Sequence, residues 1–337
     1  MDLADRFNAQ DDRFAERDVD TSFMEGMAVH ANDPAQHVSV LFAIYADIAG
    51  PHRSWHNVSV NLPDGRVAAT IDFAPLKLGP PIESGGLRYE QIEPFSHWRY
   101  RFDAAVDYAR QEDTLRHRRD QGERGHLSFE IDIKCATPAW SPPSTVFGSG
   151  ADVGTPVNVF GFYVQNHRFS GWVQDDRGTR WNLAGTGWRH HVRSQPWGEA
   201  IMGHSFIHVL FPSGRAFGLQ VAETTSGEST GYGYIVEGGV IHQAVVRSFG
   251  KWDRLMPRDE RLAIVLERED GQSAEIIGET LNNVATMNLS ARPSAADLSD
   301  QNGLLTLFGD TRWVWDGETG YATWERTKLV RALRETN

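Results

Sequence analysis

The sequence predicts an all-β protein built from two tandem antiparallel β-barrel or sandwich domains, with few and short helices. Three observations lead to this prediction: apolar and polar residues alternate along many segments, compact turn signals separate these segments, and the composition is rich in glycine and aromatic residues. The chain of 337 residues contains 32 Gly, 11 Trp, 17 Phe and 8 Tyr. At ~100–200 residues per domain, this length corresponds to about two domains.

The alternation is clearest from Leu127 to Cys135, where every odd position is apolar and every even position is polar. Successive side chains of a strand point to opposite faces, so this pattern is typical of a half-buried strand. Similar patterns predict further strands at residues 38–47, 56–62, 67–74, 87–92, 97–102, 157–165, 167–173, 179–184, 204–211, 216–223, 231–236, 240–247, 261–268, 273–281, 305–315 and 321–326.

Short turn signals lie between the predicted strands. Each contains residues that tolerate a positive φ or fix a tight reversal, and each predicts a hairpin. Hairpins at this spacing build an antiparallel meander, because parallel strands need long crossover connections. The turn segments are Pro63–Gly65, Asp175–Gly178, Pro212–Gly214, Glu237–Gly239, Asp270–Gly271 and Asp316–Gly317.

Few segments depart from the strand pattern. A short helix is predicted at residues 293–298, and the charged run at residues 110–124 is interpreted as a solvated loop. Residues 139–154 are rich in Pro, Gly and Ser, which is typical of a linker. The predicted domains are therefore residues 1–145 and 155–337.

Charge and composition exclude several classes of partner. The chain has 33 basic and 45 acidic residues and a formal net charge of −12, which disfavours binding to nucleic acid or anionic membranes. No apolar stretch is long enough for membrane insertion, and the acidic N-terminal segment is unlike a signal peptide, so we expect a cytoplasmic protein. The oligomeric state stays open, with a homodimer as one option.

Metal and thiol chemistry are not expected. Cys135 is the only cysteine, which excludes an intramolecular disulfide and a cysteine-based zinc site. Its position in an alternating strand predicts a buried, inert thiol. His204 and His208 belong to one predicted strand, where four residues span ~13 Å, too far for both to bind one ion. We instead expect them, with Phe206 between, to form one wall of a polar-lined cavity.

The densest group of chemically active side chains lies between Gly185 and Glu199, at the predicted end of a strand. A loop that holds aromatic faces beside an imidazole could bind an apolar substrate and transfer a proton. Equally, its histidines and arginines could bond to backbone while the tryptophans cover a barrel mouth. The candidate residues in this segment are Trp188, Arg189, His190, His191, Trp197 and Glu199.

Strand phase adds further candidates. Glu223 shares a face with Phe217, Leu219 and Val221, so it is a carboxylate at the rim of an apolar interior if that face points inward. Burial there would make it a general acid, whereas a strand that ends at this point would expose it. Tyr232 and Tyr234 alternate with glycine and are interpreted as packing or ligand contacts.

Several motifs together resemble one family. The chain is similar to uncharacterised bacterial two-domain proteins of the lipocalin-like (calycin) superfamily, which includes hydroxyneurosporene synthase (a carotenoid hydratase), tocopherol cyclase-like and kievitone hydratase-like proteins. The similarity covers nearly the whole chain. The matching segments are Ser54–His56, Leu62–Gly65, Glu93–Arg99, Phe169–Val173, Gly185–Gly198, Gly231–Ile235 and Arg312–Tyr321.

The resemblance implies two lipocalin-like barrels with an apolar pocket between or within them. It also implies cofactor-free protonation of an alkene, followed by water addition or cyclisation. In the family's Arg-Asp-His-Ser-Trp-Gly signature, Arg189, His191 and Trp197 match, but His190 stands where Asp is usual. That change removes the carboxylate that would orient the imidazole.

Two functional hypotheses follow. The favoured one is a cofactor-free hydratase, cyclase or isomerase that acts on a hydrophobic terpenoid, steroid or aromatic-derived molecule. In it His191, or His190 as a replacement, transfers the proton, and Glu223 or Glu199 is the carboxylate partner. The side chains expected to contact substrate are Arg189, Trp188, Trp197, His204, His208, Tyr232 and Tyr234. The alternative is a calycin-type binding protein that holds an apolar metabolite without chemistry, and a scaffold for partner proteins ranks third.

Overall fold

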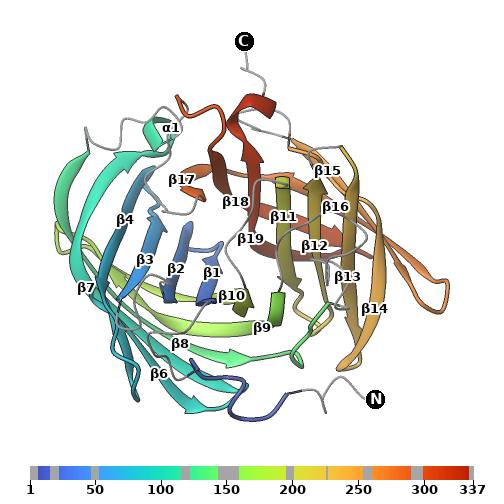
Figure 1. The fold of residues 1–337 in the computed structure, drawn as a ribbon, viewed down its shortest axis with the longest axis horizontal. Coiled ribbons are helices and arrows are strands. Elements are labelled where there is room, and N and C mark those ends of the chain that lie inside the picture. The colour runs from blue at the N-terminus through green and yellow to red at the C-terminus, as the bar shows by residue number, and fades with distance from the viewer. Residues whose placement is uncertain are drawn as a thin grey trace. The chain divides into compact units, whose positions relative to one another are not determined.

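The computed structural model describes residues 7–15, 23–46, 53–114, 122–142, 159–194, 201–224, 227–252, 260–289 and 299–333. In this part of the chain nearly every element is a strand, and each assigned strand pair is antiparallel (Figure 1). The chain forms two compact units. The first contains strands β1–β10, and the second contains strands β11–β19 with two short helices.

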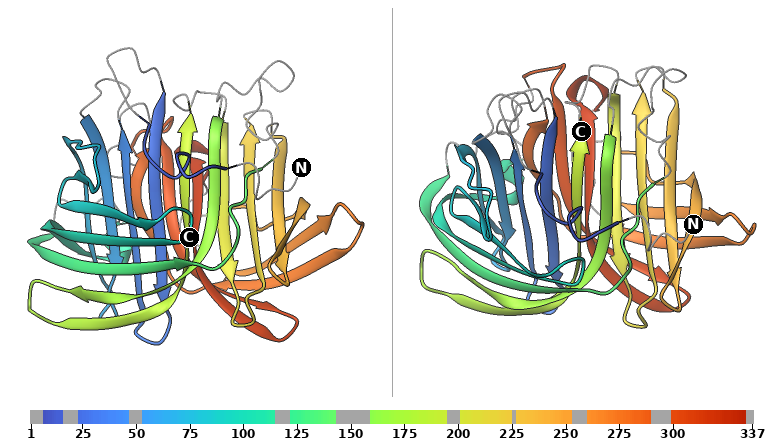
Figure 2. Two further views of the ribbon diagram at one scale, coloured as in Figure 1. Left: turned by 90° about the horizontal axis from the view of Figure 1, so that it is seen from below. Right: turned by 60° about the horizontal axis from the view of Figure 1, so that its bottom comes forward.

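The first unit is a closed ring of antiparallel strands. Its sheet order is β4-β3-β2-β1-β10-β9-β8-β7-β6-β5, and an additional pairing of β4 with β7 closes a ring of eight, from which β6 and β5 extend. In Figure 2 the long strands β7 to β10, drawn in teal to yellow-green, bend strongly along their length. The strands are β1 (Met24–Asp33), β2 (Val38–Ala46), β3 (Arg53–Asn61), β4 (Arg66–Pro75), β5 (Ile82–Ser84), β6 (Leu87–Glu93), β7 (His97–Arg110), β8 (Glu123–Cys135), β9 (Val159–Gln174) and β10 (Arg180–Ser194).

The second unit repeats this plan. Its order is β16-β15-β14-β13-β12-β11-β19-β18-β17, and a pairing of β16 with β18 closes a second ring of eight. The helices are α1 (Gln111–Thr114) and the 3₁₀ turn η3 (Val330–Ala332). The strands are β11 (Ile201–Leu210), β12 (Ala216–Thr224), β13 (Ser229–Glu237), β14 (Val240–Ser248), β15 (Arg261–Arg268), β16 (Ser273–Thr280), β17 (Val284–Leu289), β18 (Leu304–Trp315) and β19 (Glu318–Leu329).

These two rings confirm the predicted fold class. In each ring, strands that follow one another in the chain are neighbours, as in the eight-stranded up-and-down barrels of lipocalins. All six predicted turns join consecutive strands, and Gly65, between β3 and β4, has a φ of 81° that glycine adopts without strain. Among the described residues, no helix has the length and apolar character needed to cross a membrane.

Each unit has its own hydrophobic core. The first core includes Phe42, Tyr100 and Phe129, and the second includes Phe217, Trp313 and Trp324. These clusters define the inner face of the strands in each ring. Trp313 and Trp315 of β18 both lie in the second core.

The predicted domain boundary differs from the observed division. Strands β9 and β10, which we expected in the second domain, belong to the first unit, because β9 pairs with β8 and β10 pairs with β1 along its length. The second unit's strands therefore begin at Ile201. The Pro- and Gly-rich composition of residues 139–154 marks a connection between strands of one sheet, and composition alone does not distinguish that from a linker.

Other local predictions also differ. Strand β1 is missing from the predicted strands, because every position from Glu25 to Asp33 is buried and polar alternation is lost. The charged run from Arg110 begins with the short helix α1 rather than a loop. The predicted helix at residues 293–298 lies outside the described residues, as do residues 115–121 of the charged run.

Candidate functional site

The Gly185–Arg193 segment is strand and not the expected loop. It forms the second half of β10 and pairs residue by residue with β1, from Asn32 opposite Thr186 to Met24 opposite Ser194. Its side chains therefore alternate between two faces. Arg189 and His191 lie on the face of the first core, and Trp188 and His190 lie on the opposite face. The two adjacent histidines thus do not form one site.

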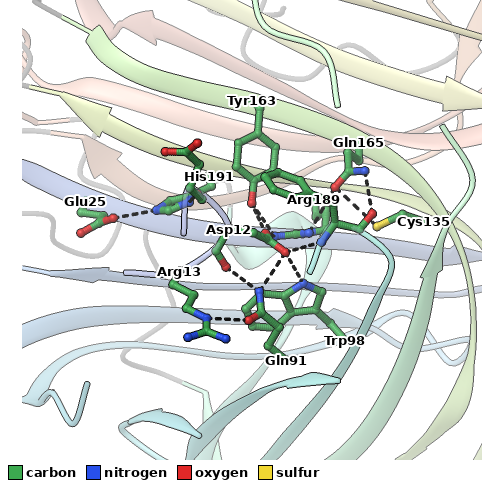
Figure 3. Close-up of polar contacts among 12 residues, drawn as sticks. Asp12, Arg13, Glu25, Gln91, Trp98, Cys135, Tyr163, Gln165, Arg189 and His191 are labelled. Atoms are coloured by element: carbon green, nitrogen blue, oxygen red, sulfur yellow. Dashed lines mark hydrogen bonds and ion pairs between the residues drawn. The ribbon is translucent and has the colours of Figure 1, made fainter. Parts of the chain in front are cut away.

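The inner face of the first unit holds a buried polar network around Arg189 (Figure 3). The Arg189 guanidinium donates to the Asp12 carboxylate, to the Tyr163 hydroxyl at 2.7 Å and to Gln165 Oε1 at 3.2 Å. The Tyr163 hydroxyl also donates to Asp12. Both Asp12 and Arg189 are buried almost completely.

Asp12 is held from several directions. The backbone N–H of Phe95 donates to its carboxylate at 2.6 Å and the Trp98 indole N–H at 3.1 Å. Burial raises the pKa of Asp12, but the charge and hydrogen bonds of Arg189 and its other donors outweigh burial, so the pKa lies below its usual range. Burial lowers the pKa of Arg189, but its electrostatic interactions with Asp12 and Tyr163 raise the pKa above the usual range. The pair is therefore a carboxylate and a guanidinium.

His191 also has a carboxylate partner, and it is Glu25 of β1. His191 Nε2 lies 2.8 Å from Glu25 Oε1, and His191 Nδ1 lies 2.9 Å from the backbone oxygen of Asp11. Arg193 Nε donates to the same Glu25 oxygen at 2.7 Å. Burial raises the pKa of Glu25, and the hydrogen bonds and charges of His191 and Arg193 lower it further than burial raises it.

This network fastens residues 7–15 to the first ring. Asp12, the Asp11 carbonyl and the Ala15 N–H, which donates to Glu25, all belong to that segment. Because the polar groups of Arg189 and His191 bond to partners within the unit, their arrangement favours a structural role. A substrate could reach them only by displacing the segment.

The opposite face of β10 carries an aromatic row. The ring of Trp188 stacks on His30 with centroids 3.7 Å apart, and Tyr45 stacks on Trp55 at 4.1 Å. The Tyr45 hydroxyl lies 3.4 Å from His190 Nε2 and connects the two stacks. His190, which stands where the similar family's signature has Asp, therefore belongs to a buried aromatic row.

In the second unit, Glu223 faces inward, which is one of the two alternatives that its strand phase left open. It shares the inner face of β12 with Phe217, Leu219 and Val221, and it is buried. Lys328 Nζ of β19 donates to Glu223 Oε2 at 2.7 Å. Glu223 is thus an ion-paired carboxylate at the inner face of the ring.

The outer face of the same unit brings together most of the other candidates. His204, Phe206 and His208 share one face of β11, with ring centroids 5.7 and 4.5 Å apart, as the sequence predicts. His208 stacks on Tyr234 of β13, and its Nδ1 lies 3.1 Å from the Tyr234 hydroxyl. The stack spans Gly218 of β12, where a Cβ would lie 2.0 Å from His208 Nδ1. Tyr232 follows the same face and is partly exposed.

This face also holds a carboxyl group, that of Glu325, which the sequence patterns do not single out. Glu325 of β19 lies directly across from Phe206, and its Oε1 lies 3.9 Å from His204 Nδ1. Burial raises the pKa of Glu325 to about 8, and burial lowers the pKa of His204 to about 3. At neutral pH the face therefore presents a protonated carboxyl beside a neutral imidazole. The side chain of Glu325 is 14% exposed.

A family model described as a domain of unknown function, DUF7064, matches residues 9–329. The chain belongs to the DUF7064 family. Comparison with curated proteins finds no match. Among solved structures, the DUF7064 chain is similar to a Nitrosomonas europaea protein provisionally named AttH, with a TM-score of 0.64, 12% identity and 95% of each chain covered. This likeness supports the tandem fold over almost the full length.

Two further predicted site residues of the DUF7064 chain, the single cysteine and a possible metal site remain to be compared with the structure. Trp197 and Glu199 lie outside the described residues. Burial raises the pKa of the Cys135 thiol, which favours the protonated, unreactive form, and its sulfur lies 3.6 Å from Gln165 Oε1. Within the described ranges, no group of three or more His, Cys, Asp or Glu side chains is arranged to hold a metal ion.

Proposed function

We propose that this DUF7064 chain is a cofactor-free acid–base enzyme, a hydratase, cyclase or isomerase, that protonates a hydrophobic terpenoid, steroid or aromatic-derived molecule. Glu325 is the proton donor. The observation that carries the proposal is the Glu325 carboxyl itself, buried on a face of aromatic rings and without a cation close enough to neutralise it among the described residues. A general acid works best when its pKa lies near the working pH, because it then holds its proton and can still release it.

The surroundings of Glu325 suit the cation that protonation creates. The ring of Phe206, directly across from Glu325 in the neighbouring strand, provides a π system that attracts positive charge. His204 is neutral at neutral pH, so it adds no competing charge. The face thus combines an acid with an aromatic wall, the pair of features that alkene protonation requires.

The proposed reaction is balanced by Glu325 alone. The O–H bond of its carboxyl breaks as the proton forms a C–H bond to one alkene carbon, and the second carbon becomes cationic. In a hydratase, water forms a C–O bond at that carbon and returns one proton to the Glu325 carboxylate. In an isomerase, a neighbouring C–H bond releases the proton instead, and in a cyclase a second double bond attacks the cation first.

The experiment compares the natural chain with Glu325→Gln after incubation with a metabolite extract in D2O. The carboxyl proton exchanges with solvent, so the product of the natural chain should carry one carbon-bound deuterium, with or without the mass of added water. Glu325→Gln should lose this conversion. Glu275→Gln, which changes an exposed glutamate of β16, is the matched control and should retain it.

Two results would count against the proposal. Conversion at the same rate by Glu325→Gln would remove Glu325 from the chemistry. Recovery of a bound metabolite chemically unchanged from the natural chain would instead support the alternative, a calycin-type binding protein.

A further inference from the structure

A separate cleft lies at one end of the second ring. Its volume is about 270 Å³, and it is lined by the last residues of β12, the first of β13 and the last of β14 with the chain that follows. It opens on the inner face of the strands, whereas Glu325 lies on the outer face. The cleft is therefore distinct from the proposed acid site.

The inner wall of the cleft is apolar. Val221 belongs to the core of the unit, and Val246 and Phe249 pack against that core. Gly231 completes the floor, because a Cβ at this position would lie 2.5 Å from Val221 Cγ2. A register shift between Val246 and Ser248 interrupts the pairing of β14 with β15, and such bulges re-aim side chains at barrel rims.

The rim of the cleft is positively charged. Arg247 is neutralised by Glu267, to which it donates two hydrogen bonds at 2.8 and 2.9 Å. Lys251 is exposed at the rim and makes no ion pair with any described residue. Lys251 therefore places a positive charge without a described counter-ion beside the apolar wall, although the chain as a whole has a net charge of −12.

The deeper charges do not cancel that of Lys251. Glu223 lies across from Ser229, which lines the cleft, but the Glu223 carboxylate is already paired with Lys328 at 2.7 Å. The ion pair is neutral overall. Among the residues that line the cleft, Lys251 carries the charge that has no described counter-ion, and this charge favours an anion.

We propose that this cleft binds a single-chain carboxylate of medium length. Its alkyl chain would lie against Val221, Val246 and Phe249, and its carboxylate would pair with Lys251 at the rim. Apolar walls with one oriented charge are the usual composition of small-molecule sites in barrel mouths. This site does not depend on the proposed chemistry at Glu325.

Octanoate is the probe, with octanol as its uncharged analogue and acetate as the anion without a chain. Isothermal titration calorimetry on the full chain should show saturable binding of octanoate, about three- to tenfold tighter than octanol, as expected for one partly desolvated ion pair. Acetate should bind too weakly to saturate. High salt should reduce the preference for octanoate over octanol.

Variants at the rim test the role of the charge. Lys251→Gln should lower octanoate affinity to that of octanol and leave octanol affinity unchanged, and Lys251→Arg should restore the preference. Lys77→Gln, which changes a lysine that is 76% exposed in the first unit, is the matched control and should have no effect. Val246→Trp should fill the cleft and abolish binding of both probes, with the circular dichroism spectrum as the check on folding.

Equal affinities for octanoate and octanol, or octanoate binding that Lys251→Gln leaves unchanged, would overturn the proposal. So would the absence of saturable binding by either probe. Octanoate binding that survives Val246→Trp in a folded variant would place the ligand elsewhere.

Discussion

Replacement of Glu325 by glutamine should make the protein more stable, by an amount that grows with pH. Glutamine has nearly the shape of the protonated acid, so the two folded chains should be equally stable where Glu325 is neutral in both the folded and unfolded states. Burial raises the pKa of Glu325 from 4.5 to about 8 in the folded chain. Between pH 4.5 and about 8, Glu325 is ionised in the unfolded chain but still protonated in the folded chain. Ionisation stabilises the unfolded state, so the free energy of unfolding of the natural chain falls as the pH rises through this range.

The magnitude follows from the two pKa values. The gap between 4.5 and about 8, at about 1.36 kcal/mol per unit of pKa, is worth about 5 kcal/mol once the folded carboxyl is also ionised. Glu325→Gln should therefore match the natural chain near pH 4, exceed it by roughly 3 kcal/mol at pH 7 and by about 5 kcal/mol at pH 9.

The assay is urea unfolding, followed by circular dichroism, at pH values from 4 to 9. Glu275→Gln is the control, because Glu275 is exposed and its variant should follow the natural chain at every pH. A constant difference between Glu325→Gln and the natural chain across this range would refute the reasoning, since it would mean that Glu325 has the same pKa in the folded and unfolded states.

The other predictions concern the first unit. Asp12→Asn should destabilise this unit by roughly 3–5 kcal/mol in urea unfolding, because the buried Arg189 charge loses its counter-ion. The same variant should speed amide hydrogen exchange in residues 7–15, and unchanged exchange would mean that Asp12 does not hold this segment on the ring. Glu25→Gln should reduce the loss of stability that the natural chain shows on acidification below pH ~4.5. The natural carboxylate has a lowered pKa, so it stabilises the fold above that pH and loses this effect as it is protonated. The same loss of stability below pH ~4.5 in both chains would contradict this prediction. Gly187→Ala should lower the melting temperature, since its Cβ would lie 1.9 Å from the backbone oxygen of His30, and an unchanged value would mean that β1 and β10 adjust freely.

Much of the fold could be predicted from local patterns. Alternation works wherever one strand face is buried and the other is wet, as in β8, and the six turns are specified by residues that adopt positive φ. Both signals fail for β1, whose two faces are buried. The domain division fails for a related reason, because the closure of the first ring depends on the pairing of β1 with β10, more than 150 residues apart in the chain.

The site was predictable only in part. Strand phase correctly groups His204 with His208, and Glu223 with the apolar residues of β12, but it leaves open whether Glu223 points inward. It does not reveal Glu325, because that residue becomes a neighbour of Phe206 only through the register of β11 with β19. The one signal in the sequence is that Glu325 directly follows the uncharged run Tyr321–Trp324.

The sequence also does not show which residue pairs with a candidate when the two are far apart in the chain. The sequence favours Glu199 or Glu223 as the carboxylate partner of His191, yet the partner is Glu25, which lies opposite Arg193 in the neighbouring strand β1. The segment 185–193 was taken for a loop because glycine and charge are dense there. Glycine is instead needed where two strands approach closely, as at Gly187.

The most direct measurement is the titration of the Glu325 carboxyl itself, by ¹³C NMR of the chain labelled at the glutamate side-chain carboxyl, with Glu325→Gln to assign the resonance. A midpoint near pH 8 is predicted, which would mean that the aromatic face of the second unit holds a protonated acid at neutral pH. A midpoint near 4.5 would contradict the account, because Glu325 would then be an ordinary carboxylate with no proton to give.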